Sequence, residues 1–125
     1  MAQSVALRKK VVLVVEDEPL LMMMAIDLVE EAGFEAVEAT NAFEAVQILE
    51  ARADIRIVFT DIDMPGGMDG MMLAAAVRDR WPPIEIVIVS GHRRPKEADL
   101  PLRSHFFSKP YEARDIVDTL RKLGS

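Results

Sequence analysis

Residues 11–15 (VVLVV) form an unbroken apolar run, and this run constrains the fold more than any other feature of the sequence. A strand with one face in water alternates apolar and polar residues, whereas a continuous β-branched run is typical of a strand covered on both faces. Such a strand needs helices on both sides of its sheet. The run therefore predicts an α/β protein with a mostly parallel sheet.

Strand-like and helical patterns alternate along the rest of the chain. We predict further strands at residues 34–39, 55–60, 84–89 and 104–108, and helices at residues 19–32, 41–51, 70–80 and 111–123. Pro95 and Pro101 leave room only for a short helix near residues 95–100. Right-handed crossovers with the most apolar strands in the centre give a flavodoxin-like (βα)5 doubly wound fold, strand order 2-1-3-4-5.

Length and composition restrict the class of protein. The 125 residues suit one domain, residues 1–125, with a core at about 9–123. A net charge of -6 argues against nucleic acid as a partner, and no cysteine is present to form disulfides or thiolate metal sites. The sequence lacks a secretory signal and any apolar run of the roughly 18 residues that a membrane span requires. We expect a cytoplasmic protein that binds neither nucleic acid nor membrane.

Several polar residues follow the predicted strands. Under the predicted topology Glu16 and Asp17, Asp61, Ser90 and Lys109 all come to the edge of the sheet where its strands end. Ligands bind at this edge in open parallel sheets. A single aspartate after a strand commonly only caps a turn, but here Asp61 is expected to have other polar groups beside it.

These residue types suit phosphoryl transfer. Three carboxylates packed together repel one another and raise their pKa values unless a cation lies among them, and hard oxygen ligands suit Mg²⁺. Lys109 and the metal would balance the charge on a phosphoryl group, and the Ser90 hydroxyl could hydrogen-bond it. Asp61 would then be the nucleophile that becomes an aspartyl-phosphate.

Four segments, VVLVVEDE, VFTDIDMPGGMDG, IVIVSGH and FFSKPY, resemble the receiver domain of two-component response regulators. The resemblance covers residues 9–123. It implies a flavodoxin-like phosphoprotein that takes a phosphoryl group from a sensor histidine kinase or a phosphotransfer protein onto Asp61 with Mg²⁺. By position it also implies that Glu16 and Asp17 form the acidic pair of the metal site.

The resemblance assigns the remaining roles by position. The backbone carbonyl of Asp63 would complete the protein ligands of the metal. Lys109 would be the lysine of the family motif. Ser90 and Phe106 would be the switch pair: the hydroxyl moves toward the phosphoryl group while the aromatic ring turns inward. Phe106 is equally well interpreted as a core residue of an edge strand, and this role is compatible with the switch role. Asp63 and His92 stand where the family tunes phosphoryl lifetime, although an exposed loop histidine without such a task is the simpler reading.

Three features depart from the family pattern. Glu16 stands where aspartate is more usual, and its longer arm allows contact with the metal directly or through water. The loop 64–70 is one residue longer than the common pattern. The short fourth helix puts the usual dimerisation face in doubt. A homodimer is therefore possible but is not predicted over a monomer.

Three functions are compatible with these residues, and the stand-alone receiver fits them best. A stand-alone receiver without an output domain would signal to an unidentified protein target by contact or act in a phosphorelay, and would be no enzyme beyond self-dephosphorylation. A haloacid-dehalogenase-type phosphatase would use Asp61 as nucleophile and Asp63 as general acid and base. Its metal-binding acids, however, follow the lysine, and the chain is short for a capping insertion. A degenerate receiver would act only as a docking module. The complete set of acids, hydroxyl and lysine argues against this third function.

Overall fold

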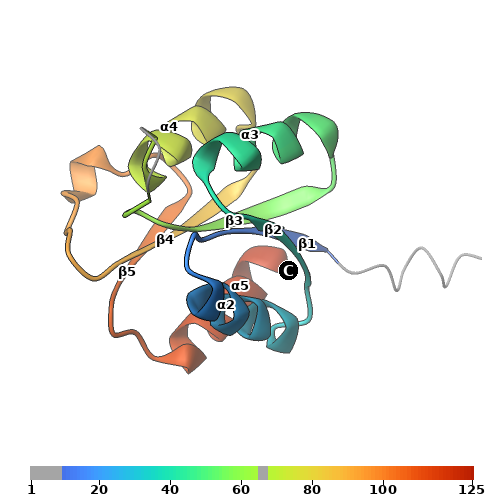
Figure 1. Cartoon of the computed structure of the whole chain (residues 1–125), viewed down its shortest axis with the longest axis vertical. Coiled ribbons are helices and arrows are strands. Elements are labelled where there is room, and N and C mark those ends of the chain that lie inside the picture. The colour runs from blue at the N-terminus through green and yellow to red at the C-terminus, as the bar shows by residue number, and fades with distance from the viewer. Residues whose placement is uncertain (1–9, 65–67) are drawn as a thin grey trace, which may run out of the picture.

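The computed structural model describes residues 10–64 and 68–125. Five parallel strands form one sheet in the order β2-β1-β3-β4-β5 (Figure 1). The strands are β1 (Val11–Val15), β2 (Glu35–Ala39), β3 (Ile55–Asp61), β4 (Glu85–Ser90) and β5 (Ser104–Ser108). The predicted fold class and strand order are confirmed.

Helices cover both faces of this sheet, with α2 and α5 on one face and α3 and α4 on the other (Figure 1). Their bounds are α2 (Pro19–Glu31), α3 (Ala42–Ala51), α4 (Gly70–Arg80) and α5 (Ala113–Gly124). Asn41 caps α3 and Asp69 caps α4, each accepting a hydrogen bond from a backbone N–H of the first turn. No helix in the described ranges is long and apolar enough to cross a membrane.

The short helix predicted near residues 95–100 is not an α-helix. The segment forms a single 3-10 turn, η1 (Glu97–Asp99), in which no residue is buried. Pro95 and Pro101 explain this difference, because proline lacks the N–H that a helix needs and disfavours helical geometry in the residue before it. The fourth crossover connection therefore contributes little to the core.

The unbroken apolar run of β1 supplies side chains to two separate core clusters. Val11, Leu13 and Val15 pack on the side of α3 and α4, whereas Val12 and Val14 pack on the side of α2 and α5. All five are at most 3% exposed. Burying a valine or leucine side chain fully is worth about 1.5–3 kcal/mol, so both faces of this strand stabilise the domain.

Strand register brings the polar residues to one edge. Val15 pairs with Thr60, Asp61 pairs with Val89, and Ser90 pairs with Ser108, so the strands end at nearly the same level. The residues that end or follow them therefore lie around one crevice, as predicted for an open parallel sheet.

Candidate functional site

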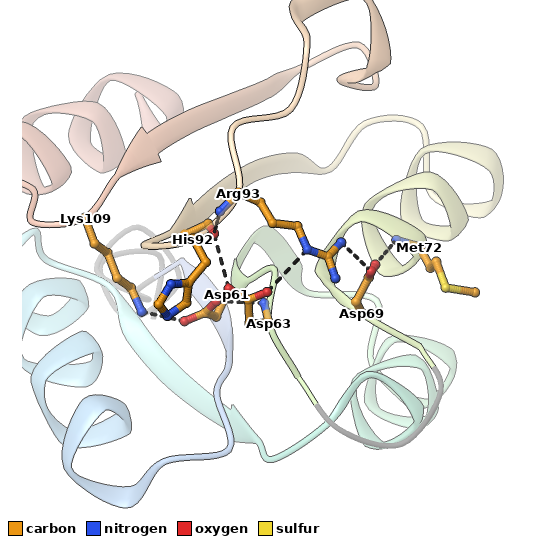
Figure 2. Close-up of polar contacts among 8 residues, drawn as sticks. Asp61, Asp63, Asp69, Met72, His92, Arg93 and Lys109 are labelled. Atoms are coloured by element: carbon orange, nitrogen blue, oxygen red, sulfur yellow. Dashed lines mark hydrogen bonds and ion pairs between the residues drawn. The ribbon is translucent and has the colours of Figure 1, made fainter.

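Asp61 and Lys109 form the closest contact of the site. Asp61 is the last residue of β3 and is only 7% exposed. Lys109 follows β5, and its Nζ donates to Asp61 Oδ2 at 2.5 Å (Figure 2). Burial alone would lower the pKa of Lys109, but the hydrogen bond and charge of Asp61 outweigh burial and raise this pKa above its usual value. The pair is thus a carboxylate with an ammonium group fixed beside it.

Backbone contacts hold the Asp61 carboxylate and the loop after it. The N–H of Asp63 donates to Asp61 Oδ1 at 2.9 Å, so both carboxylate oxygens have a donor. The loop then returns so closely that a Cβ on Gly70 would lie 2.2 Å from the carbonyl oxygen of Asp61. Only glycine fits where α4 begins, and this close approach holds the start of α4 against the end of β3.

Glu16 is the second buried carboxylate at this edge. It is 7% exposed, and its Oε2 accepts a hydrogen bond from the N–H of Glu18 at 3.1 Å. Burial, with a smaller contribution from the charge of Asp61, raises the pKa of Glu16 to about 7. Glu16, Asp61 and Lys109 line a common cavity of about 30 Å³, large enough for a water molecule or a metal ion.

Of the three carboxylates predicted to pack together, the structure places two, Glu16 and Asp61, on one cavity, and the metal-ligand role of Asp17 stays a prediction. Asp17 is exposed and lines a different depression, which Glu16 also borders. Across residues 10–64 and 68–125, no three acidic or histidine side chains lie close enough together to form a ready-made metal site. The sequence placed Glu16 and Asp17 at the correct strand end, but neighbouring residues in an extended segment point in different directions. Two carboxylates, Glu16 and Asp61, share the cavity.

Ser90 is fully buried at the end of β4, and its hydroxyl contacts Asp63. Its Oγ donates to Asp63 Oδ2 at 3.3 Å and accepts from the backbone N–H groups of His92 at 3.2 Å and Arg93 at 3.0 Å. The hydroxyl is therefore held by the loop that follows β4.

Arg93 and Asp69 belong to the same network, and neither was predicted from the sequence as a site residue. Arg93 Nε lies 3.4 Å from Asp63 Oδ1, and Arg93 Nη1 donates to Asp69 Oδ2 at 2.9 Å (Figure 2). Asp69 Oδ1 in turn accepts from the N–H of Met72 at 3.0 Å, which caps α4. Burial alone would raise the pKa of Asp69, but the Met72 N–H and the Arg93 guanidinium hold it below its usual value. Asp69 could have been found as a cap before a helical pattern, whereas no local signal marks Arg93.

The structure places the other predicted residues as follows. Phe106 is partly buried on β5, opposite Ile88, and packs against the core cluster beneath α3 and α4 without being fully buried; its switch role stays a prediction. His92 is exposed, as the simpler interpretation expected. The metal-ligand role of the Asp63 carbonyl and the effect of Asp63 and His92 on phosphoryl lifetime stay predictions. Residues 65–67 of the long loop lie outside the described residues.

Comparisons with known proteins agree on one family. The response regulator receiver domain matches residues 12–121. Sensor kinase CckA of Brucella abortus is 31% identical over 90% of this chain, and response regulator receiver protein CpdR of the same species is 27% identical over 91%. The crystal structure of a response regulator receiver protein from Sinorhizobium medicae superposes with a TM-score of 0.85 and 26% identity, covering 94% of this chain and 95% of that one.

Coverage differs among these relatives. The chain spans 12% to 26% of the length of three relatives that are 30% or 31% identical to it, CckA among them. It spans 96% of CpdR. The shared part is thus one domain, and it is the same domain in all of them.

Proposed function

The chain belongs to the response regulator receiver family, the phosphoacceptor module of two-component systems, and from this premise we propose that Asp61 accepts the phosphoryl group. The contact of Asp61 Oδ2 with Lys109 Nζ at 2.5 Å is the observation that carries the proposal. It places a cation next to a carboxylate that is fixed on a strand at the ligand-binding edge of the sheet.

The transfer step follows from these groups. A carboxylate oxygen of Asp61 attacks the phosphorus of a phosphohistidine on a sensor histidine kinase or a phosphotransfer protein. The new P–O bond forms as the P–N bond breaks, and the departing imidazole nitrogen takes up a proton. Lys109 keeps its ammonium charge because its pKa is raised, so it can offset the negative charge that gathers on the phosphoryl oxygens.

The acidic groups fit a Mg²⁺ ion. Two buried carboxylates share the small cavity, and burial together with the charge of Asp61 raises the pKa of Glu16, so a divalent cation between them would offset both effects. Mg²⁺ commonly binds through one or two carboxylates plus phosphate oxygens, so two suffice. Glu16 and Asp61 would hold the ion, with Asp17 and the backbone carbonyl of Asp63 as further ligands. When bound, Mg²⁺ neutralises charge on the transferring group.

Ser90 and Phe106 are proposed to report the phosphorylated state. The Ser90 hydroxyl would leave Asp63, which it contacts at 3.3 Å, and donate to a phosphoryl oxygen on Asp61. The N–H of Asp63 already donates to Asp61, so the two acceptors are close neighbours. Phe106 is only partly buried against the core, and its ring would turn further inward. Such a two-state element converts a local charge into an altered surface.

We further propose that the domain acts in the cytoplasm and signals by protein contact or as a phosphorelay intermediate, without a nucleic-acid partner. Slow self-dephosphorylation would return it to the resting state. Self-association on phosphorylation is tested by measuring solution mass with and without beryllofluoride, a mimic of the phosphoryl group.

Replacing Asp61 tests the central assignment. Incubation with acetyl phosphate and Mg²⁺ should add one phosphoryl group to the wild type and none to Asp61→Asn, as measured by intact-protein mass spectrometry. Asp63→Asn is the matched control, because its side chain lies two residues away and should leave phosphorylation possible. Labelling of Asp61→Asn at the wild-type level would refute the site.

A further inference from the structure

An apolar groove lies beside α2, on the side of the outermost strand β2. It has a volume of about 330 Å³, and its floor is formed by Pro19, Met22, Met23 and Ile26. These residues follow one another at helical spacing, so they form one stripe along the first half of α2. Met22 is buried, whereas Met23 is 63% exposed. The stripe therefore begins in the core and opens to the surface.

The exposed part of this floor is suited to binding. A methionine side chain is flexible and polarizable, so it adapts to different apolar partners. Since β2 ends the sheet, no strand of residues 10–64 and 68–125 lies beyond it on this side. An exposed apolar surface rimmed by polar groups marks an interaction site more often than a structural accident.

Acidic groups rim the groove. Glu16 and Asp17 line one part and Glu38 of β2 lines another. Within the described residues, none of the three forms an ion pair at this groove with a lysine, arginine or histidine. The rim is thus negative, and Glu38, which is not among the proposed Mg²⁺ ligands, keeps its charge when the ion is bound.

The acidic residues are concentrated in one part of the sequence. Residues 11–51 contain ten acidic residues and no lysine or arginine, although the whole chain has 15 basic residues. This segment carries a charge of -10 in a protein whose net charge is only -6. Glu35 and Glu50 of this segment pair with Arg52 and Arg80, but the acids that line the groove form no such pair within the described residues. A locally negative surface attracts partners of the opposite sign and repels those of the same sign.

We propose that this groove docks a basic, amphipathic segment of a partner protein. An apolar side chain of the segment would enter the methionine floor, and its lysine or arginine residues would lie against Glu38 and the acidic rim. Apolar anchors at helical spacing are the usual way in which a helix binds such a groove. Residues 10–64 and 68–125 carry both halves of this recognition: the apolar floor and the opposite charge.

Charge excludes the other occupants. Nucleic acid and anionic lipid would be repelled by the rim. A second copy of the chain is poorly matched, because residues 52–125 hold twelve basic and eleven acidic residues and are nearly neutral. A free cation lacks the apolar anchor that the methionine floor would bury. A protein segment with both features fits.

The test uses the full chain and a fluorescent synthetic peptide with leucines every third or fourth position and lysines between them. Anisotropy should show binding by the wild type, and Met23→Ser with Glu38→Gln should weaken it about tenfold or more, as central anchors do in groove interfaces. The matched control is Met72→Ser with Glu97→Gln. Met72 is 54% exposed on α4 and Glu97 is exposed on η1, away from the groove. The control should bind like the wild type.

Methyl NMR then locates the peptide. Addition of peptide should shift the Met22 and Met23 methyl signals and leave the Met72 methyl unchanged. A peptide with serine in place of leucine should bind more weakly, which separates docking from charge attraction alone. Equal weakening in both double variants, equal binding of the serine peptide, or shifts only at Met72 would each overturn the proposal.

The outcome is independent of the proposed phosphorylation. Met23 and Glu38 lie outside the group of residues around Asp61, so the groove variant should accept a phosphoryl group from acetyl phosphate at the wild-type rate. Loss of peptide binding with normal phosphorylation supports the groove. Normal peptide binding by Asp61→Asn would show that the groove functions even if the phosphoacceptor assignment failed.

Discussion

The two sides of the Asp61 site differ in how their charges are compensated. On the side of β3, β4 and β5, Asp61 contacts Lys109, and Arg93 bridges Asp63 and Asp69. On the side of β1, α2 and β2, Glu16 is buried without a cation of its own, and the acids around it belong to a segment that has no basic residue. We call the first the closed side, because its charges are paired within the domain. We call the second the open side, because the acids that line the groove beside α2 form no ion pair in the described residues.

This difference separates two tasks. Ion pairs between loops fix the position of the groups that meet a phosphoryl oxygen, which favours transfer because little reorganisation is needed. Uncompensated carboxylates raise the free energy of the isolated domain, and a bound divalent ion or basic partner would relieve it. The first side is prepared for chemistry and the second for binding.

The largest effect on stability is expected from adding a methyl group on the closed side, where β3 and α4 pack closely. Gly70→Ala would put a Cβ at 2.2 Å from the Asp61 carbonyl oxygen, so β3 and α4 must move apart. We expect a loss of about 3 kcal/mol in the free energy of unfolding, measured by urea denaturation. Gly91→Ala is the control, because its Cβ would lie 3.7 Å from Lys109 Cβ, an ordinary van der Waals contact, and the substitution should cost under about 0.5 kcal/mol. Similar losses in both variants would disprove the close packing.

The next effect concerns the open side and depends on pH. The pKa of Glu16 is raised from 4.5 to about 7, so the folded state holds a proton that the unfolded state releases between these values. Stability therefore falls as pH rises from about 4.5 to 7, by at most about 3 kcal/mol. Glu16→Gln should remove this loss and be more stable than the wild type at pH about 8, but not at pH about 4.

Glu18→Gln is the control for this experiment, because Glu18 is exposed next to Glu16. Unfolding curves at both pH values would show an unchanged difference between Glu18→Gln and the wild type. Mg²⁺ should stabilise the wild type at high pH and stabilise Glu16→Gln less. An advantage of Glu16→Gln that is equal at both pH values would contradict the assigned titration.

The smallest effect is expected from the Arg93 bridge. Its side chain is 51% exposed, and exposed ion pairs contribute about 0–1 kcal/mol, so Arg93→Gln should lower stability by less than about 1 kcal/mol. The pKa of Asp69 should rise, because Arg93 helps to hold it below its usual value, and stability should then be lost at a higher pH during acidification. An NMR titration of Asp69 measures this, with Arg93→Lys expected to retain part of the shift. An identical Asp69 pKa in all three proteins would rule out the bridge.

Much of the fold could be read from the sequence because its signals are local. The apolar run of β1, the cap Asn41, and the alternation of strands with helices each reflect short-range physical preferences. The segment after β4 was less predictable, since two prolines indicate interruption but not whether one turn of helix survives between them.

The sequence by itself determined which residues reach the site, because strand ends in a parallel sheet share one edge, and so Asp61, Ser90 and Lys109 were expected together. Only the tertiary structure decided how these groups are paired. Asp17 lines the groove beside α2 and not the cavity of Asp61, Ser90 contacts Asp63, and Arg93 joins two loops that are distant in the sequence. Strand order follows from patterns that repeat along the chain, whereas the direction of a side chain in a loop depends on contacts with residues far away in the sequence.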